Sequence, residues 1–124
     1  MSHSDHWETH GLRRVFSGTI DAESLIDINL KLHGNPRFEH AEYVLNDFSE
    51  VDDFVFSLDD INEIAIFDKV ATRSKHRLKI AIVSQHPELR MWAQQYCELM
   101  EGSAFQGKLF MEVEEAYLWV KDAV

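Results

Sequence analysis

The apolar positions of this chain follow strand and helix periodicities in alternation. Segment 77–84 (RLKIAIVS) is the clearest strand, because its IAIV centre is apolar on both faces, as in a central parallel strand covered by helices. The pattern predicts strands at 6–10, 12–18, 41–48, 77–84 and 105–111, and helices at 21–33, 54–71, 87–101 and 113–124. We therefore expect a single α/β domain, 1–124, in which about four helices pack on a mixed sheet of about five strands.

Segment 54–71 (FVFSLDDINEIAIFDKVA) carries apolar residues on nearly every side of its predicted helix. Ser57 is a natural N-cap, and Asp59 and Asp60 suit the positive end of the helix dipole. At about 100° per residue the apolar side chains form separate strips, which are Leu58, Ile61 and Ala65; Ile64, Phe67 and Ala71; and Ile66 with Val70. A helix on one sheet needs only one such strip. The surplus apolar surface predicts a contact with a neighbouring helix, a second subunit, an apolar ligand or a membrane surface, and favours a binding module over a catalyst.

Composition narrows the class of protein. The chain has 124 residues, 45% of them hydrophobic and 27% charged, which is enough to bury a core and is typical of a soluble globular protein. No apolar run approaches the ~20 residues that cross a bilayer, and the N-terminus lacks the regions of a secretory signal. The single cysteine, Cys97, can form no internal disulfide, which favours a cytoplasmic location. A net charge of −10 argues against a nucleic-acid partner, because phosphate binding needs a basic surface.

The charges are unevenly placed along the chain. Segment 47–68 contains eight acidic residues and no basic one, and a basic run follows it directly. The members of that run are Lys69, Arg73, Lys75, Arg77 and Lys79. The common explanation is a helix C-terminus that complements its own dipole, followed by an exposed strand start. The alternative is an anion or lipid-headgroup site, which would allow peripheral contact with the inner face of the membrane.

Other polar residues give weaker indications of chemistry. Three histidines near the N-terminus, His3, His6 and His10, have spacings of three and four, which suit zinc only on a helix, whereas this segment is predicted to be a terminus and a strand. His86, Asp47 and Ser49 follow predicted strands, where α/β folds place ligands. No Gly-x-Ser-x-Gly elbow accompanies them. We therefore predict no metal, no cofactor and no catalytic residue.

Several short motifs spread over almost the whole chain resemble those of a known family. They are GTIDAESL (18–25), NPRF (35–38), VLNDFS (44–49), the strand 80–83 and EEAYLWV (114–120). With the order of predicted elements, they make the chain similar to a SpoIIAA-like protein of the broad STAS group, which is itself similar to CRAL-TRIO lipid-binding domains. The resemblance implies a STAS-type fold and a non-enzymatic module that binds partners or apolar ligands.

The resemblance also bears on regulation. Phosphoregulated members of the group place a serine directly after an aspartate, at the start of the helix that follows the VLND-type strand. Here the residue after Asp53 is Phe54, which has no hydroxyl, and the nearest serine is Ser57. A phosphate on Ser57 would meet a helix N-terminus but would be repelled by Asp59 and Asp60. The alternative function is therefore a homodimeric interaction or regulatory module of anti-sigma-antagonist type without the usual phosphoserine.

The predicted ligand site lies between the helices that begin near Ser57 and Pro87. One wall of the apolar pocket is formed by Ile61, Ile64, Phe67 and Ala71, the other by Trp92 and Tyr96, and Arg73 or Lys75 lies near the head of an anionic, lipid-like ligand. Each large apolar side chain removed from water contributes roughly 1.5 to 3 kcal/mol. The competing interpretation is that the same residues form core and a dimer interface.

Overall fold

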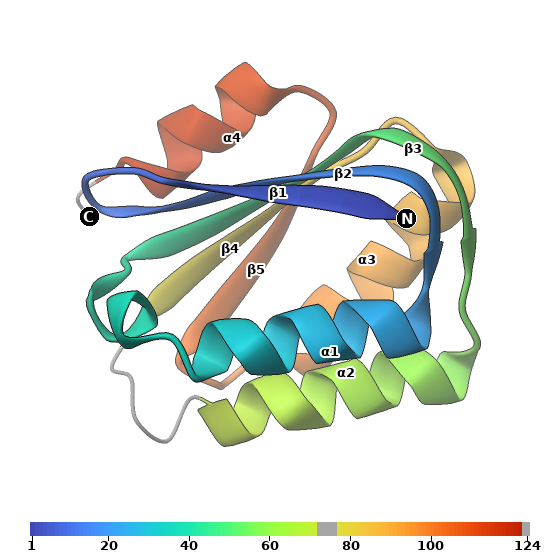
Figure 1. Ribbon diagram of the computed structural model, residues 1–124, viewed down its shortest axis with the longest axis horizontal. Helices are drawn as coiled ribbons and strands as arrows, with labels where there is room; N and C mark the ends of the chain where they lie inside the picture. Colours follow the sequence, from blue (N-terminus) through green and yellow to red (C-terminus); the bar gives the residue numbers. More distant parts are fainter. Residues whose placement is uncertain (72–76, 123–124) are drawn as a thin grey trace.

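The computed structural model describes residues 1–71 and 77–122, and all of their strands belong to one five-stranded sheet with the order β1-β2-β3-β4-β5 (Figure 1). The first pair of strands is antiparallel, and every other pair is parallel. The strands are β1 (Ser2–Trp7), β2 (Gly11–Asp21), β3 (Tyr43–Val55), β4 (Leu78–Val83) and β5 (Phe105–Phe110). The predicted mixed sheet is confirmed.

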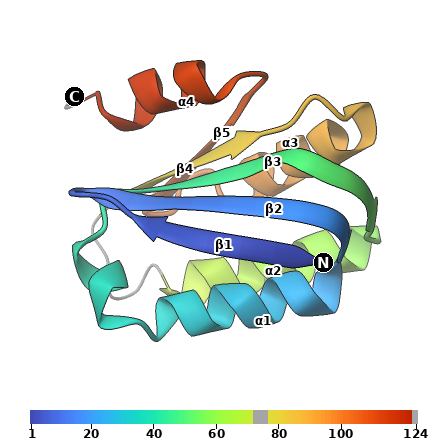
Figure 2. The ribbon, with the colours of Figure 1, turned by 45° about the horizontal axis from the view of Figure 1, so that its top comes forward.

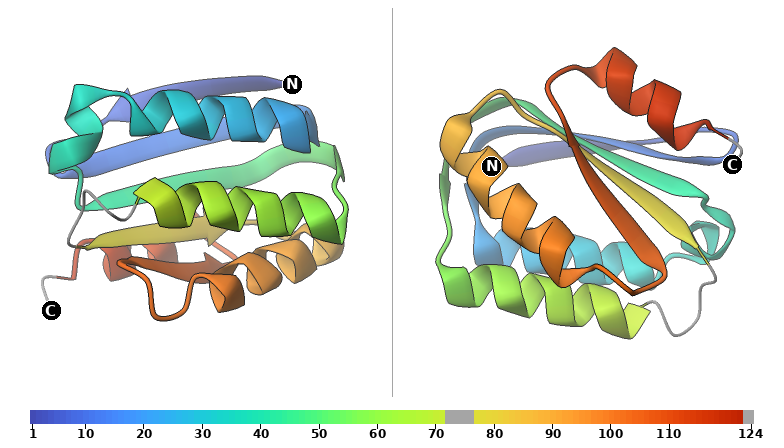
Figure 3. Two further views of the ribbon diagram at one scale, coloured as in Figure 1. Left: turned by 90° about the horizontal axis from the view of Figure 1, so that it is seen from below. Right: turned by 180° about the vertical axis from the view of Figure 1, so that it is seen from behind.

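The helices cover the two faces of the sheet unequally. One face is covered by α1 (Ala22–His33), α2 (Leu58–Ala71) and α3 (Pro87–Leu99), and the other by the short α4 (Val113–Val120) (Figure 2). Figure 3 shows α2 lying between α1 and α3. A 3-10 helix, Pro36–His40, leads from α1 to β3. No helix in the described ranges is long and apolar enough to cross a membrane.

Local chemistry fixes where the helices begin. The Asp21 carboxylate accepts a hydrogen bond from the Ser24 backbone N–H at 2.8 Å and caps α1. At α2 the Ser57 hydroxyl accepts from the Asp60 N–H at 3.2 Å, while the Asp60 carboxylate accepts from the Ser57 N–H at 2.8 Å. This reciprocal pair is a capping box, and the predicted N-cap role of Ser57 is confirmed. Pro87 is the first residue of α3, where its missing N–H breaks no hydrogen bond.

Several element boundaries differ from the sequence prediction: β2 continues to Asp21, α2 begins at Leu58 and α4 ends at Val120, and the largest changes are in β3 and β1. Strand β3 was expected to end at Phe48 before an acidic loop, but it continues to Val55, paired with Asp21 of β2. Pairing satisfies the backbone there while the acidic side chains stay in water. The predicted strand 6–10 is instead Ser2–Trp7, because the chain turns where the Glu8 N–H donates to the Gly11 carbonyl at 2.8 Å.

The alternation along each strand divides the core into two clusters. In β4, Ile80 and Ile82 belong to the cluster beneath α1–α3, whereas Ala81 and Val83 belong to the cluster beneath α4. Strand β4, which lies between β3 and β5, is therefore apolar on both faces, as its sequence predicts. The α4 cluster also contains Ala116, which like Ala81 is 0% exposed. Small residues at these positions let α4 lie close to the sheet.

Candidate functional site

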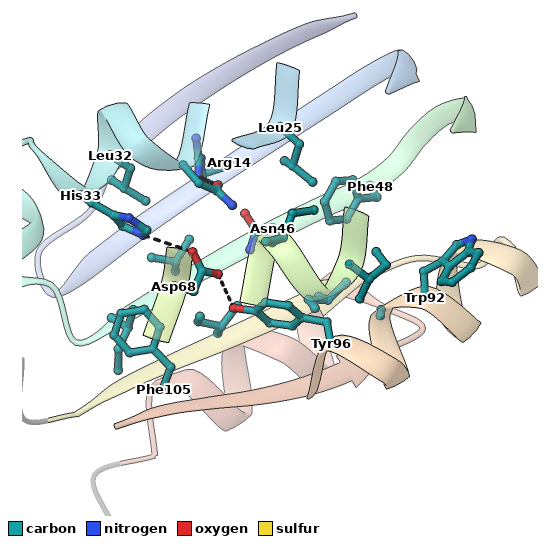
Figure 4. Close-up of a pocket in the computed structure, with 18 of the residues that line it drawn as sticks. Arg14, Leu25, Leu32, His33, Asn46, Phe48, Asp68, Trp92, Tyr96 and Phe105 are labelled. Atoms are coloured by element: carbon teal, nitrogen blue, oxygen red, sulfur yellow. Dashed lines mark hydrogen bonds and ion pairs between the residues drawn. The ribbon is translucent and has the colours of Figure 1, made fainter. Parts of the chain in front are cut away.

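A cavity of about 90 Å³ lies within the core between the sheet and helices α1, α2 and α3 (Figure 4). Its wall is mostly apolar, with side chains from β3, β4, α2 and α3. Ile61 and Ile64 of α2, Ile82 of β4 and Leu89 and Ala93 of α3 all line it. These residues are buried in the single chain, so the apolar part of the cavity is built from the core itself.

A polar cluster lines the same cavity, and Asp68 is at its centre. Asp68 lies in the last turns of α2 and is 4% exposed. Its Oδ2 accepts a hydrogen bond from the Tyr96 hydroxyl of α3. Its Oδ1 lies 3.3 Å from His33 Nε2 at the end of α1, within ion-pair distance, but it accepts no hydrogen bond from the described residues (Figure 4). One carboxylate oxygen is therefore left with unused hydrogen-bonding capacity inside the core.

The environment of Tyr96 keeps its hydroxyl protonated. Burial, and after it the neighbouring Asp68 carboxylate, raises the pKa of Tyr96 well above its ordinary value of 10.0. The phenol can therefore donate its hydrogen bond to Asp68 throughout the physiological pH range. It is held as a hydrogen-bond donor and is poorly suited to act as a base or a nucleophile.

Arg14 brings a buried cation to the same region. Arg14 is two residues from both Leu12 and Phe16 along β2, so all three side chains point to the α1–α3 face. Arg14 is 1% exposed there. Its guanidinium donates from Nε to Asp5 Oδ1 at 3.1 Å and from Nη1 to Asn29 Oδ1 at 3.0 Å. Burial lowers the pKa of Arg14, and attraction to the Asp5 and Asp68 carboxylates opposes that shift.

Two further polar groups complete the lining. Asn46 of β3 lies opposite Arg14 in the strand register, and its side chain also lines the cavity. Trp92 of α3 lies on the other side of Tyr96 from His33 and Asp68 in Figure 4. Its indole Nε1 is buried and has no hydrogen-bond partner in the described part of the chain. The cavity thus offers a free acceptor at Asp68 and a free donor at Trp92.

The sequence anticipated part of this lining. Ile61, Ile64, Trp92 and Tyr96 line the cavity, as predicted. Phe67 and Ala71 do not; both are half-buried, because the buried strip of α2 consists of Ala65 and the three residues that line the cavity, Ile61, Ile64 and Asp68. Arg73 and Lys75, the predicted anion-binding pair, lie outside the described residues. Peripheral membrane contact stays a prediction.

The third strip of α2 faces away from the cavity. Ile66 is 60% exposed and Val70 is 52% exposed. At about 100° per residue both lie on the opposite side of the helix from Asp68. The predicted surplus apolar surface of α2 is therefore present on the single chain, and nothing in the described residues covers it.

Sequence reasoning missed the polar cluster because it treated charged residues as surface residues. The positions of the charged residues in the sequence could have indicated their burial. Asp68 follows Ile61 by seven residues and Ile64 by four, which places a carboxylate on the buried strip of the helix. Arg14 likewise takes an inward position of β2 between Leu12 and Phe16. A charge on an otherwise apolar face is the pattern that would have identified both.

The polar residues that follow predicted strands, Asp47, Ser49 and His86, were weaker candidates for a functional site. Asp47 and Ser49 lie inside β3, and Asp47 pairs with Arg13 Nη2 at 3.5 Å. His86 packs edge-on against the Phe54 ring, with ring centroids 5.0 Å apart. Within residues 1–71 and 77–122, no group of histidine, cysteine and acidic residues is arranged to hold a metal ion.

Comparison with known proteins supports the fold. No protein-family model and no curated protein matches the sequence. The structure is similar to the crystal structure of an uncharacterised protein of the DUF3478 family with a SpoIIAA-like fold from Shewanella loihica PV-4. The two chains are 16% identical, with a TM-score of 0.56, over 96% of this chain and 92% of the other. At this identity the likeness shows the fold alone, and the chain has the SpoIIAA-like fold that its motifs indicate.

Proposed function

We propose that this domain is a non-enzymatic binding module whose cavity takes a small amphipathic molecule. The observation that carries the proposal is the Asp68 carboxylate, which is buried in a largely apolar cavity and has one oxygen without a hydrogen bond. Leaving a buried acceptor unsatisfied costs about 1–3 kcal/mol, and more for a charged group. A ligand with an apolar body and one hydrogen-bond donor would remove this cost and fill the space beside it.

The lining favours binding over catalysis. None of the described residues around the cavity is a serine, threonine, cysteine or lysine, the usual nucleophiles of covalent catalysis. The Tyr96 hydroxyl is committed to Asp68, and its raised pKa keeps it protonated. Arg14 is already bonded to Asp5 and Asn29. The cluster can orient a bound group, and it lacks the paired nucleophile and base that a reaction would need.

Cavity size limits what the ligand can be. An apolar cavity of about 150 Å³ holds benzene, which corresponds to about 25 Å³ for each non-hydrogen atom. On that ratio a cavity of about 90 Å³ accommodates about four non-hydrogen atoms. A sixteen-carbon acyl chain would need roughly 400 Å³ by the same ratio. The proposal therefore narrows the expected lipid-like ligand to a small molecule, or to the small end of a larger one.

An NMR titration with 1-propanol tests the proposal. We expect saturable shifts of backbone amides in α2, α3 and β4, grouped around Ile64, Ile82 and Ala93. The matched control is Ala93→Leu, which fills the cavity from α3 and should abolish the shifts while the protein stays folded. Shifts that are absent up to the solubility limit, or that persist unchanged in Ala93→Leu, would refute binding in this cavity.

A second candidate function rests on the exposed strip of α2. Ile66 and Val70 project apolar surface from the helix layer, and exposed apolar patches often mark contact surfaces. A two-fold dimer could cover them, provided that it buries on the order of 1,000 Å² in total. Light scattering should then show a dimer for the wild type and a folded monomer for Val70→Glu. A wild-type monomer across the micromolar range would remove this candidate.

A further inference from the structure

Asp68 is the one acidic side chain among the described residues that line the cavity. The guanidinium of Arg14 meets two carboxylates, Asp5 through a direct hydrogen bond and Asp68 through a longer-range attraction. Asp5 is exposed and does not line the cavity, whereas Asp68 is buried beside it. The hydrogen bonds that Arg14 makes go to Asp5 and Asn29, so its cationic head is engaged away from Asp68 Oδ1. Arg14 therefore makes no hydrogen bond to the Asp68 oxygen that is left without one.

Arg14 and His33 are the basic side chains among the described residues of the lining, and neither donates a hydrogen bond to Asp68 Oδ1. Apart from Arg14 and His33, the described residues that line the cavity include no basic side chain. The ring nitrogen of His33 comes within 3.3 Å of Oδ1 without making a hydrogen bond. Asn46 lines the same region from β3 and can offer its amide oxygen as a second acceptor. This arrangement complements a group with several hydrogen-bond donors and a positive charge.

We propose that the Asp68 end of the cavity takes a primary ammonium group, so that the site selects small alkylamines over alcohols and rejects carboxylates. This inference rests on the proposed function and names the chemical class of its ligand. The ammonium would donate to Asp68 Oδ1 in a charge-assisted hydrogen bond. Its alkyl chain would lie among Ile64, Ile82 and Leu89.

A carboxylate ligand would be disfavoured at the Asp68 end of the cavity. It would add a negative charge beside the buried Asp68 carboxylate, and the two like charges would repel each other. Trp92 Nε1, a buried donor without a hydrogen-bond partner among the described residues, lies on the other side of Tyr96 from Asp68 (Figure 4). A fatty-acid-like orientation therefore gains one neutral hydrogen bond and leaves Asp68 unsatisfied.

The test compares 1-propylamine, 1-propanol and propionate, which share the same short chain, in NMR titrations at pH 7. For the wild-type protein we expect the amine to bind about tenfold more tightly than the alcohol, since a hydrogen bond to a charged group is stronger than a neutral one. Propionate should give no saturable shift around Asp68. In Asp68→Asn the amine should lose its advantage, to within about twofold of the alcohol, while the alcohol still binds.

The matched control is Asp59→Asn, which removes one negative charge from an exposed position in the first turn of the same helix. It should leave the wild-type ranking unchanged. If the amine and the alcohol bind equally to the wild type, or if propionate binds best, the preference for an ammonium is wrong although the cavity binds ligands. If none of the three probes binds, both proposals fail. The ranking in the wild type decides the question even if Asp68→Asn does not fold.

Discussion

The two faces of the sheet differ in how closely they are packed and in whether their polar groups have hydrogen-bond partners. Beneath α4, the residues Leu45, Ala81 and Ala116 are fully buried in one apolar cluster. Polar groups at its border find partners: the Tyr43 and Tyr117 hydroxyls both donate to the Glu8 carboxylate. Beneath α1–α3, the core contains a cavity and leaves Asp68 Oδ1 and Trp92 Nε1 without hydrogen bonds.

The difference follows from how each face is covered. A single short helix with alanine at its contact can settle closely on the sheet, so small residues decide the packing of the α4 face. Three helices on the opposite face must pack on one another as well as on the sheet, and the polar side chains of α1, α2 and β2 meet in the space between them. We infer that the α4 face serves stability and that the α1–α3 face holds the function.

The largest expected contrast comes from adding the same side-chain atoms to each face. Ala116→Leu inserts three carbons into the closely packed α4 face and should lower the free energy of unfolding by about 1–3 kcal/mol. Ala93→Leu adds them beside the cavity and should cost less than about 1 kcal/mol, since the space already exists. Urea denaturation measures both. Equal costs would show that the two faces are packed alike.

A second contrast removes one tyrosine hydroxyl from each face. Tyr96→Phe leaves the buried Asp68 carboxylate without its hydrogen bond and should cost about 1–3 kcal/mol. Tyr43→Phe removes a bond to Glu8, which is exposed and keeps its bond from Tyr117, so the expected cost is about 0.5–1 kcal/mol. Thermal and urea unfolding should rank the two variants in this order, and the reverse order would contradict the account of the Asp68 cluster.

A smaller effect is expected at the start of α2, outside both faces. Ser57→Ala removes half of the capping box and should cost about 1 kcal/mol of stability. Binding of 1-propanol should not change, because Ser57 is exposed and does not line the cavity. Stoichiometric phosphate on Ser57 in protein from its native cell, with loss of a partner on phosphorylation, would instead restore a regulatory switch at this position.

The smallest effect concerns Cys97, on the side of α3 that packs toward β5. A Cβ on Gly107 would lie 2.8 Å from the Cys97 Sγ, so the two elements are in close contact. Burial, followed by the neighbouring Glu98 charge, raises the pKa of the Cys97 thiol to about 11. The thiol therefore stays protonated at pH 8, and iodoacetamide should react far more slowly with the native protein than with the urea-unfolded chain. Similar rates would indicate that the α3 side of the cavity face is open.

The order of elements could be predicted from the sequence because periodicity and caps act locally. Asp21 and Ser57 mark helix starts through hydrogen bonds made within a few residues, and Pro87 marks one because a helix start loses no hydrogen bond to its missing N–H. The extension of β3 to Val55 could not be predicted in this way, since it depends on pairing with β2, a partner distant along the chain.

The sequence prediction found the apolar half of the candidate site and missed the polar half. Ile61 and Ile64 could be identified by their helical spacing, and Trp92 and Tyr96 by their size on the facing helix. Asp68 and Arg14 lie at inward positions that indicate burial, but their partners come from other elements that the fold brings to them. Charge on a single sequence does not reveal that pairing.

A crystal structure of the protein soaked with 1-propylamine tests the central claim most directly. The account predicts electron density for the amine inside the cavity, with its nitrogen at about 2.7–2.9 Å from Asp68 Oδ1 and its chain beside Ile64 and Ile82. A cavity that stays empty at saturating amine, or amine density confined to the outer strip of Ile66 and Val70, would contradict it.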